Sequence, residues 1–181
     1  MKVLLWDLDD TLYDLLAPFK KACEAVLGEN LADSEFTYRR FRFRGDEVFE
    51  ASQRGEMGLE ESRILRFCRA MEDCGYEMDR EEALRFQKLY EEEQGKISLS
   101  SCMREILTEW KDRGIPMGIV TNGPEEHQKR KCRALGMEAW ISDRCLVISG
   151  AVGSMKPERE IFHMAAKIME AAPEDLSLIH I

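Results

Sequence analysis

The chain has 181 residues, of which 44% are hydrophobic, and a formal net charge of −9 at pH 7. This length suits one globular core with room for an inserted subdomain. The acidic balance argues against nucleic acid or an anionic membrane as the main partner, and no apolar run reaches the roughly 20 residues that a membrane helix needs. The six cysteines form no CxxC pair, so we expect a reduced, cytoplasmic protein.

The chain opens with an apolar run over residues 2–6, which predicts a short, buried strand of a parallel sheet. Asp7, Asp9 and Asp10 follow at once. Because crowded carboxylates repel one another, we expect a cation or a phosphate-like substrate beside Asp7 and Asp9. Asp10 is expected to make local hydrogen bonds in the turn after the strand.

Residues 15–100 are rich in glutamate and arginine and contain no convincing strand pattern. Apolar residues recur there at helical spacing, for example at Ile64, Phe67 and Met71. This region is therefore predicted to be an α-helical subdomain inserted after the first strand. Its run of basic and aromatic residues at 38–44 fits either a contact with substrate or, as the favoured interpretation, a solvated helix face with apolar contacts.

Strands and helices alternate in the last part of the chain. The pattern predicts, in order, a strand over residues 117–120, a helix over 124–135, a strand over 145–148, a helix over 157–169 and a strand over 176–181. This order predicts an α/β fold with a doubly wound, parallel, Rossmann-like sheet. Residues 1–14 and 101–181 would form the sheet domain, and residues 15–100 a helical cap.

Polar residues follow three of the predicted strands, at the sheet edge where such folds bind ligands. Asp7 and Asp9 follow the first strand, Thr121 and Asn122 the second, and Lys156 a glycine-containing loop after the third. Each of these residues alone could be a turn, a helix cap or a solvated side chain. Two carboxylates, a hydroxyl and an ammonium at one edge are more specific, and they indicate a catalytic or phosphate-binding site.

These stretches resemble the motifs of the haloacid dehalogenase superfamily, in its phosphatase-like branch with a helical cap. LLWDLDDT resembles the first motif (D-x-D-x-T), GIVTNG the second and MKPEREIF the third, in the same order and spacing. The fourth motif, a strand followed by Gly-Asp and a further acid, has no match. The corresponding strand LSLIHI ends at Ile181, so we expect a C-terminally incomplete chain, with a natural short form as the alternative.

The resemblance implies a magnesium-dependent phosphomonoesterase. Asp7 would be the nucleophile that forms an aspartyl-phosphate, and Asp9 the general acid and then the base. Thr121, Asn122 and Lys156 would bind the phosphate, with Lys156 also offsetting the negative charge on Asp7. Mg²⁺ would be held by the side chain of Asp7 and the backbone carbonyl of Asp9, because this cation prefers oxygen ligands.

The substrate is expected to be a small phosphorylated metabolite, with a nucleoside monophosphate as one candidate, and the protein a monomer or homodimer. Asp9 argues against a hydrolytic dehalogenase, because a departing halide needs no proton. A catalytically impaired or non-catalytic binding protein on the same fold is the alternative, because the fourth motif is absent. His127 lies early in a predicted helix. A position outside the site is the favoured interpretation, and a side chain that reaches the site is the alternative.

Overall fold

A computed structural model describes residues 2–28 and 33–180 of the chain. The chain divides into two compact units: one comprises Met1–Leu15 and Gly95–Ile181, the other Leu16–Gln94. We call them the core unit and the helical unit. Within the described residues, no helix combines the length and the apolar character that crossing a membrane would require.

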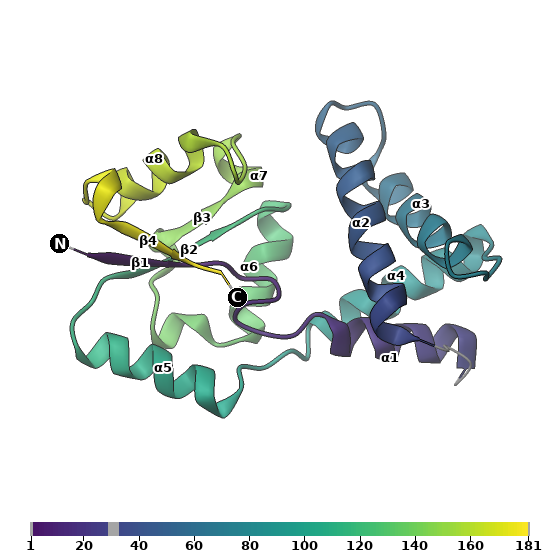
Figure 1. Ribbon diagram of the computed structural model, residues 1–181, viewed down its shortest axis with the longest axis horizontal. Helices are drawn as coiled ribbons and strands as arrows, with labels where there is room; N and C mark the ends of the chain where they lie inside the picture. The colour runs from purple at the N-terminus through teal and green to yellow at the C-terminus, as the bar shows by residue number, and fades with distance from the viewer. Residues whose placement is uncertain (1, 29–32, 181) are drawn as a thin grey trace. The chain divides into compact units, whose positions relative to one another are not determined.

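The core unit is built on a parallel sheet (Figure 1). Its strands among the described residues are β1 (Val3–Trp6), β2 (Met117–Thr121), β3 (Leu146–Ile148) and β4 (Leu176–Ile179), in the spatial order β3-β2-β1-β4. Leu5 in β1 lies opposite Gly118 on one side and Leu178 on the other. All residues of β1 and β2 are buried, as expected for strands covered on both faces. The predicted α/β fold with a parallel sheet is confirmed.

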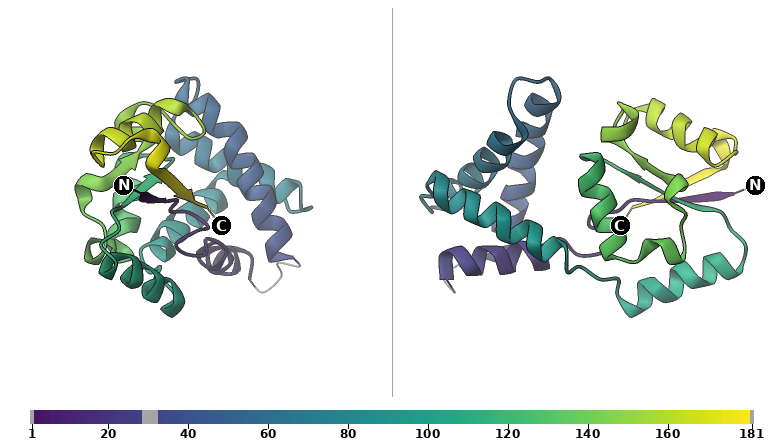
Figure 2. Two further views of the ribbon diagram at one scale, coloured as in Figure 1. Left: turned by 60° about the vertical axis from the view of Figure 1, so that its left-hand side comes forward. Right: turned by 180° about the vertical axis from the view of Figure 1, so that it is seen from behind.

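Helices cover both faces of this sheet, with α8 on one face and α5 on the other (Figures 1 and 2). The helices of the core unit are α5 (Ser101–Asp112), α6 (Glu125–Ala134), α7 (Ser149–Val152) and α8 (Arg159–Ile168), with short 3₁₀ turns at Met137–Ala139, Asp143–Cys145 and Pro173–Asp175. Ile161 and Ala165 of α8 pack with Val3 and Val120 of the sheet. These apolar contacts fix the sheet on which the site is built.

The observed boundaries follow the predicted ones closely, with two differences. α6 and α8 begin and end within two residues of the prediction, and β2 continues to Thr121. α7 was not predicted, because four residues containing a glycine give no helical period. β4 ends at Ile179, and the last predicted residue, Ile181, lies outside the described residues.

The helical unit consists of helices that pack around aromatic side chains. Its helices are α1 (Leu16–Leu27), α2 (Ser34–Gln53), α3 (Leu59–Glu72) and α4 (Arg80–Gln94). α1 packs mainly against α4, and α2 against α3. Phe67 and Phe86 stack with their ring centroids 3.8 Å apart, and Phe19 and Phe41 are buried beside them. Large rings at helical spacing thus supply the core of this unit.

The basic run of α2 connects this helix to the end of α3. Arg40 and Arg44 both donate to the carboxylate of Asp73, with Nη2–Oδ distances of 2.6 and 2.7 Å. Phe41 points inward and is 1% exposed, and the guanidinium of Arg66 lies 4.0 Å from the centroid of its ring. The favoured interpretation of residues 38–44 is a solvated helix face with apolar contacts. The burial of Phe41 agrees with it, whereas Arg40 and Arg44 are only 30% and 24% exposed in their ion pairs with Asp73.

Candidate active site

Asp7 follows β1 directly and is buried, with 6% of its surface exposed. Its Oδ1 accepts hydrogen bonds from the backbone N–H of Leu8 (2.7 Å) and forms an ion pair with Nζ of Lys156 (2.6 Å). Its Oδ2 lies 2.6 Å from Nδ1 of His180, which follows β4. The structure therefore brings the predicted nucleophile and the predicted lysine into direct contact, although they are far apart in the sequence.

Asn122 positions the loop that carries Lys156. Its side-chain amide donates to the carbonyl of Lys156 (3.0 Å) and its Oδ1 accepts from the backbone N–H of the same residue (2.8 Å). The carboxylate of Glu158 accepts from the hydroxyl of Ser154 (2.7 Å) and the N–H of Met155 (3.0 Å). Asn122 was predicted to contact phosphate; in this structure both ends of its amide hold Lys156, and the phosphate contact stays a prediction.

Glycines allow the loop after β2 and the start of α7 to approach backbone to backbone. The N–H of Gly150 donates to the carbonyl of Gly123 (3.1 Å), and the N–H of Gly123 donates to the hydroxyl of Ser149 (2.9 Å). A Cβ atom at Gly150 would lie only 2.7 Å from that carbonyl oxygen, and Gly123 has φ +142°. Both positions therefore require glycine, and their packing holds the ends of the two strands together.

Asp9 has a set of partners separate from those of Asp7. Nζ of Lys131 lies 2.8 Å from its Oδ1 and 2.9 Å from its Oδ2. The hydroxyl of Tyr13 donates to Oδ1 (2.5 Å), and Nε2 of Gln128 lies 3.1 Å from Oδ2. Gln128 and Lys131 lie on the same face of α6, because they are three residues apart in a helix. Asp9 is thus held by α6 and by Tyr13, in the segment that follows Asp9 in the chain.

Gln128 connects Asp9 to the end of β2. Its Nε2 also lies 2.8 Å from Oγ1 of Thr121 and 2.6 Å from the carbonyl of Asn122, so that two N–H groups face three acceptors. Gln128 and Thr121 are each 1% exposed. Thr121 therefore lies in the same buried network as Asp9, while Lys156 lies beside Asp7.

The surroundings of Asp9 favour its ionised form. Burial by itself raises the pKa of this carboxyl, but the charge of Lys131 and the hydrogen bonds from Lys131, Tyr13 and Gln128 outweigh burial and lower the pKa to about 2. In this arrangement Asp9 is ready to accept a proton. To donate one, it must first be protonated against the field of Lys131.

Four residues of this site were not found from the sequence: Gln128, Lys131, His180 and Tyr13. On α6 the buried positions are Gln128, Lys131 and Cys132, the spacing that an inward face requires. Polar residues at inward positions of a helix were the signal that could have identified the first two. The neighbouring His127 lies on a less buried part of the helix, with Nδ1 3.4 Å from Nη2 of Arg130.

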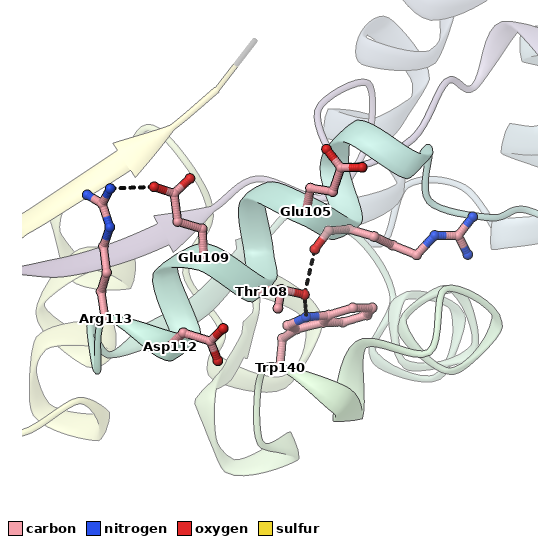
Figure 3. A pocket seen from close by; sticks show the side chains of 7 residues that line it. Glu105, Thr108, Glu109, Asp112, Arg113 and Trp140 are labelled. Atoms are coloured by element: carbon pink, nitrogen blue, oxygen red, sulfur yellow. Dashed lines mark hydrogen bonds and ion pairs between the residues drawn. The ribbon is translucent and has the colours of Figure 1, made fainter.

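A hollow of about 670 Å³ lies elsewhere, between α5 and Trp140 (Figure 3). It is lined by Arg104, Glu105, Thr108, Glu109, Asp112, Arg113 and Trp140. The indole of Trp140 donates to the hydroxyl of Thr108 (3.0 Å), and Arg113 pairs with Glu109. None of the residues described above lines this hollow, so it is not the candidate active site.

Comparisons with known proteins agree with the architecture. A model of the haloacid dehalogenase-like hydrolase family matches residues 1–176. A phosphoserine phosphatase of Thermus thermophilus is 28% identical over 207 aligned positions, covering 99% of this chain and 80% of the relative.

Two solved structures show the same fold. The putative hydrolase YfnB of Bacillus subtilis, bound to magnesium, is 23% identical with a TM-score of 0.62, over 92% of this chain and 71% of its own. A dehalogenase is 16% identical with a TM-score of 0.77, over 99% and 76% of the two chains. At these identities the likeness concerns the fold alone.

Proposed function

The chain belongs to the haloacid dehalogenase-like hydrolases, and from that premise we propose that it is a magnesium-dependent phosphomonoesterase that forms an aspartyl-phosphate on Asp7. The predicted family and the prediction of a hydrolase are confirmed by the match over residues 1–176. The contact that supports the finer proposal best is the ion pair between Asp7 and Lys156, at 2.6 Å. It places a cation beside a buried carboxylate at the carboxyl edge of the sheet, where phosphate would bind.

In the first step, an oxygen of Asp7 attacks phosphorus, and the bond from phosphorus to the leaving oxygen breaks. Carboxylates are established nucleophiles for such steps. Lys156 attracts the phosphoryl oxygens, and its ammonium can turn from Asp7 toward them as the bond forms. Asp9 supplies the proton that the leaving alkoxide needs. Activated aryl esters depend less on that proton than alkyl esters do.

In the second step, water attacks phosphorus and displaces the carboxylate of Asp7. Asp9 accepts the proton of this water, and the proton serves the leaving group of the next substrate. The ion pair with Lys131 favours the carboxylate form of Asp9 that this step requires. Thr121 is proposed to donate a hydrogen bond to the phosphoryl group.

The residues present suit magnesium. The side chain of Asp7 and the backbone carbonyl of Asp9 are oxygen donors, and Mg²⁺ is commonly held by one or two carboxylates together with phosphate and water. Within the part of the chain that the structure describes, no group of three His, Cys, Asp or Glu side chains forms a metal site. When bound, Mg²⁺ would supply positive charge to the phosphoryl oxygens.

The proposed substrate is a small phosphorylated metabolite. The T. thermophilus relative is a phosphoserine phosphatase, which makes phosphoserine a candidate beside the nucleoside monophosphates considered in the sequence analysis. The helical unit is inserted in the chain between Leu15 and Gly95 of the core unit. We propose that it is the cap that selects the substrate and excludes water.

A panel of phosphorylated metabolites, assayed with the full-length protein and Mg²⁺, tests this proposal. We expect release of inorganic phosphate from at least one amino-acid or nucleotide monoester, lost on chelation of the metal. Lys129→Met, which changes an exposed ion pair with Glu125, is a control that should leave activity unchanged. Absence of phosphate release from every compound would contradict the proposal.

A binding protein without turnover is the second candidate. Both carboxylate oxygens of Asp7 already face nitrogen atoms, of Lys156 and His180, 2.6 Å away. If these contacts persist, a phosphate could bind without being attacked. Saturable binding of inorganic phosphate by a protein that releases none from its esters would favour this candidate.

A further inference from the structure

The ion pair between Lys131 and Asp9 is not explained by any of the family motifs identified in the sequence. Lys131 lies in the last turn of α6, and it is only 5% exposed. Its ammonium lies within 2.9 Å of both oxygens of Asp9. Removing a lysine from water costs free energy, so a buried lysine needs a specific partner. Here that partner is a residue of the proposed chemistry.

The geometry fixes the carboxylate of Asp9 from several sides. Lys131 reaches both of its oxygens, Tyr13 donates to Oδ1 and Gln128 to Oδ2. These donors come from α6 and from the segment after Asp9, so rotation of the carboxylate would break several hydrogen bonds together. The side chain of Asp9 is nevertheless 17% exposed, which leaves part of it accessible to water.

Asp7 is held by other groups. Within the part of the chain that the structure describes, its carboxylate contacts Leu8, Lys156 and His180, whereas the ammonium of Lys131 lies against Asp9. Loss of Lys131 should therefore disturb the residue that transfers protons and leave the nucleophile in place. The two steps of the proposed reaction depend differently on these two aspartates.

We propose that Lys131 is a positioning residue that holds the carboxylate of Asp9 for hydrolysis of the aspartyl-phosphate. This inference rests on the proposed phosphatase function. In that step the oxygen of water bonds to phosphorus, the bond from phosphorus to Asp7 breaks, and its electron pair returns to the Asp7 carboxylate. The proton of the water passes to Asp9, whose acceptor oxygen Lys131 keeps in place.

An aryl phosphate separates the two steps. Its leaving group departs without a proton, so formation of the intermediate needs Asp7 but not Asp9. For such a substrate kcat/KM reports formation of the intermediate, and kcat reports its hydrolysis when hydrolysis is slow. A defect in the position of Asp9 should therefore lower kcat and KM together.

The test is Lys131→Met in the full-length enzyme, with p-nitrophenyl phosphate and Mg²⁺. We expect kcat to fall about 10- to 100-fold, KM to fall in parallel, and a burst of nitrophenol to appear before steady state. Lys129→Met, on the same helix, is the matched control and should show none of these changes. A fall in kcat at constant KM and without a burst would overturn the role of Lys131.

A double-mutant cycle covers the case in which Lys131→Met alone fails to fold. Asp9→Asn together with Lys131→Met removes both buried charges, which a folded interior tolerates better than one. Because Lys131 acts through Asp9, the double variant should have the kcat and KM of Asp9→Asn. A further loss in the double variant would overturn the inference. Inactivity of the wild type would instead overturn the proposed function, and the role of Lys131 with it.

Discussion

The helices α2 and α6 are both rich in basic residues, yet they place their charges in different surroundings. In α2, Arg40 and Arg44 meet Asp73 at the surface of the helical unit, with side chains that are 30% and 24% exposed. In α6, Lys131 meets Asp9 inside the core unit, and its side chain is 6% exposed. The number of basic residues in a helix therefore indicates little about its role; burial and the identity of the partner indicate more.

Asp73 and Asp9, the partners of these basic residues, also differ in their surroundings. Each has a pKa of about 2, but for a different reason. At Asp73, the hydrogen bonds from Arg44 lower the pKa most. The hydrogen bonds from Arg40 and the charges of both arginines lower it further. For Asp9, burial raises the pKa, and Lys131 with its hydrogen bonds overcomes this effect. The arginine partners of Asp73 are 30% and 24% exposed, whereas Lys131 beside Asp9 is 6% exposed. Water therefore reaches the partners of Asp73 more readily, and the two sites should respond differently to mutation, acid and salt.

The largest difference is expected when each carboxylate is removed. Asp9→Asn removes the carboxylate charge that lies beside the buried ammonium of Lys131, which should lower the free energy of unfolding by about 3 kcal/mol. Urea denaturation of the purified protein measures this loss. The added change Lys131→Met should restore most of it, and a loss below about 1 kcal/mol in Asp9→Asn would contradict the described burial of the pair.

The stability of the protein in acid should also depend on the buried ion pair between Asp9 and Lys131. The folded pKa of Asp9 lies below its ordinary value of 3.8, so the carboxylate stabilises the fold above about pH 4, and this contribution is lost as the pH falls toward 2. Its size is about 2 kcal/mol. Urea denaturation at several pH values should show the wild type losing that much more than the variant Asp9→Asn/Lys131→Met; equal losses would count against the ion pair.

The smallest effect is expected at the surface cluster. Asp73→Asn removes the shared partner of Arg40 and Arg44, and we expect the melting temperature to fall by only about 2–4 °C. In about 1 M NaCl the difference from wild type should nearly vanish, because salt screens exposed charges. If the difference in melting temperature persisted at high salt, the charges of this cluster would not be screened by solvent, and their description as exposed would be wrong.

The sequence predicts the fold and the residues at the strand ends because their signals are local. Asp7 and Thr121 follow or end apolar strands, and a parallel sheet brings such residues to one edge. The contact of Lys156 with Asp7 was expected from that rule and from the family resemblance. These predictions required the order of the elements and the family motifs.

The network around Asp9 could not be read in the same way. Gln128 and Lys131 belong to a helix of largely polar residues, in which a lysine is by default expected at the surface. Only the rotation of α6 against the sheet shows that these two side chains point inward. For Asn122 the sequence indicates a polar residue at the site. Its two hydrogen bonds to the backbone of Lys156 depend on the course of the chain after β3, which the sequence does not show.

The central claim, that Asp7 carries the phosphoryl group during turnover, is tested most directly by trapping the intermediate. The full-length enzyme is mixed with an aryl phosphate and Mg²⁺, quenched rapidly in acid, digested, and analysed by mass spectrometry. We predict one phosphoryl group on the peptide that contains Asp7, increased in Lys131→Met and absent in Asp7→Asn. A phosphorylated peptide from another part of the chain, or turnover retained in Asp7→Asn, would contradict the account.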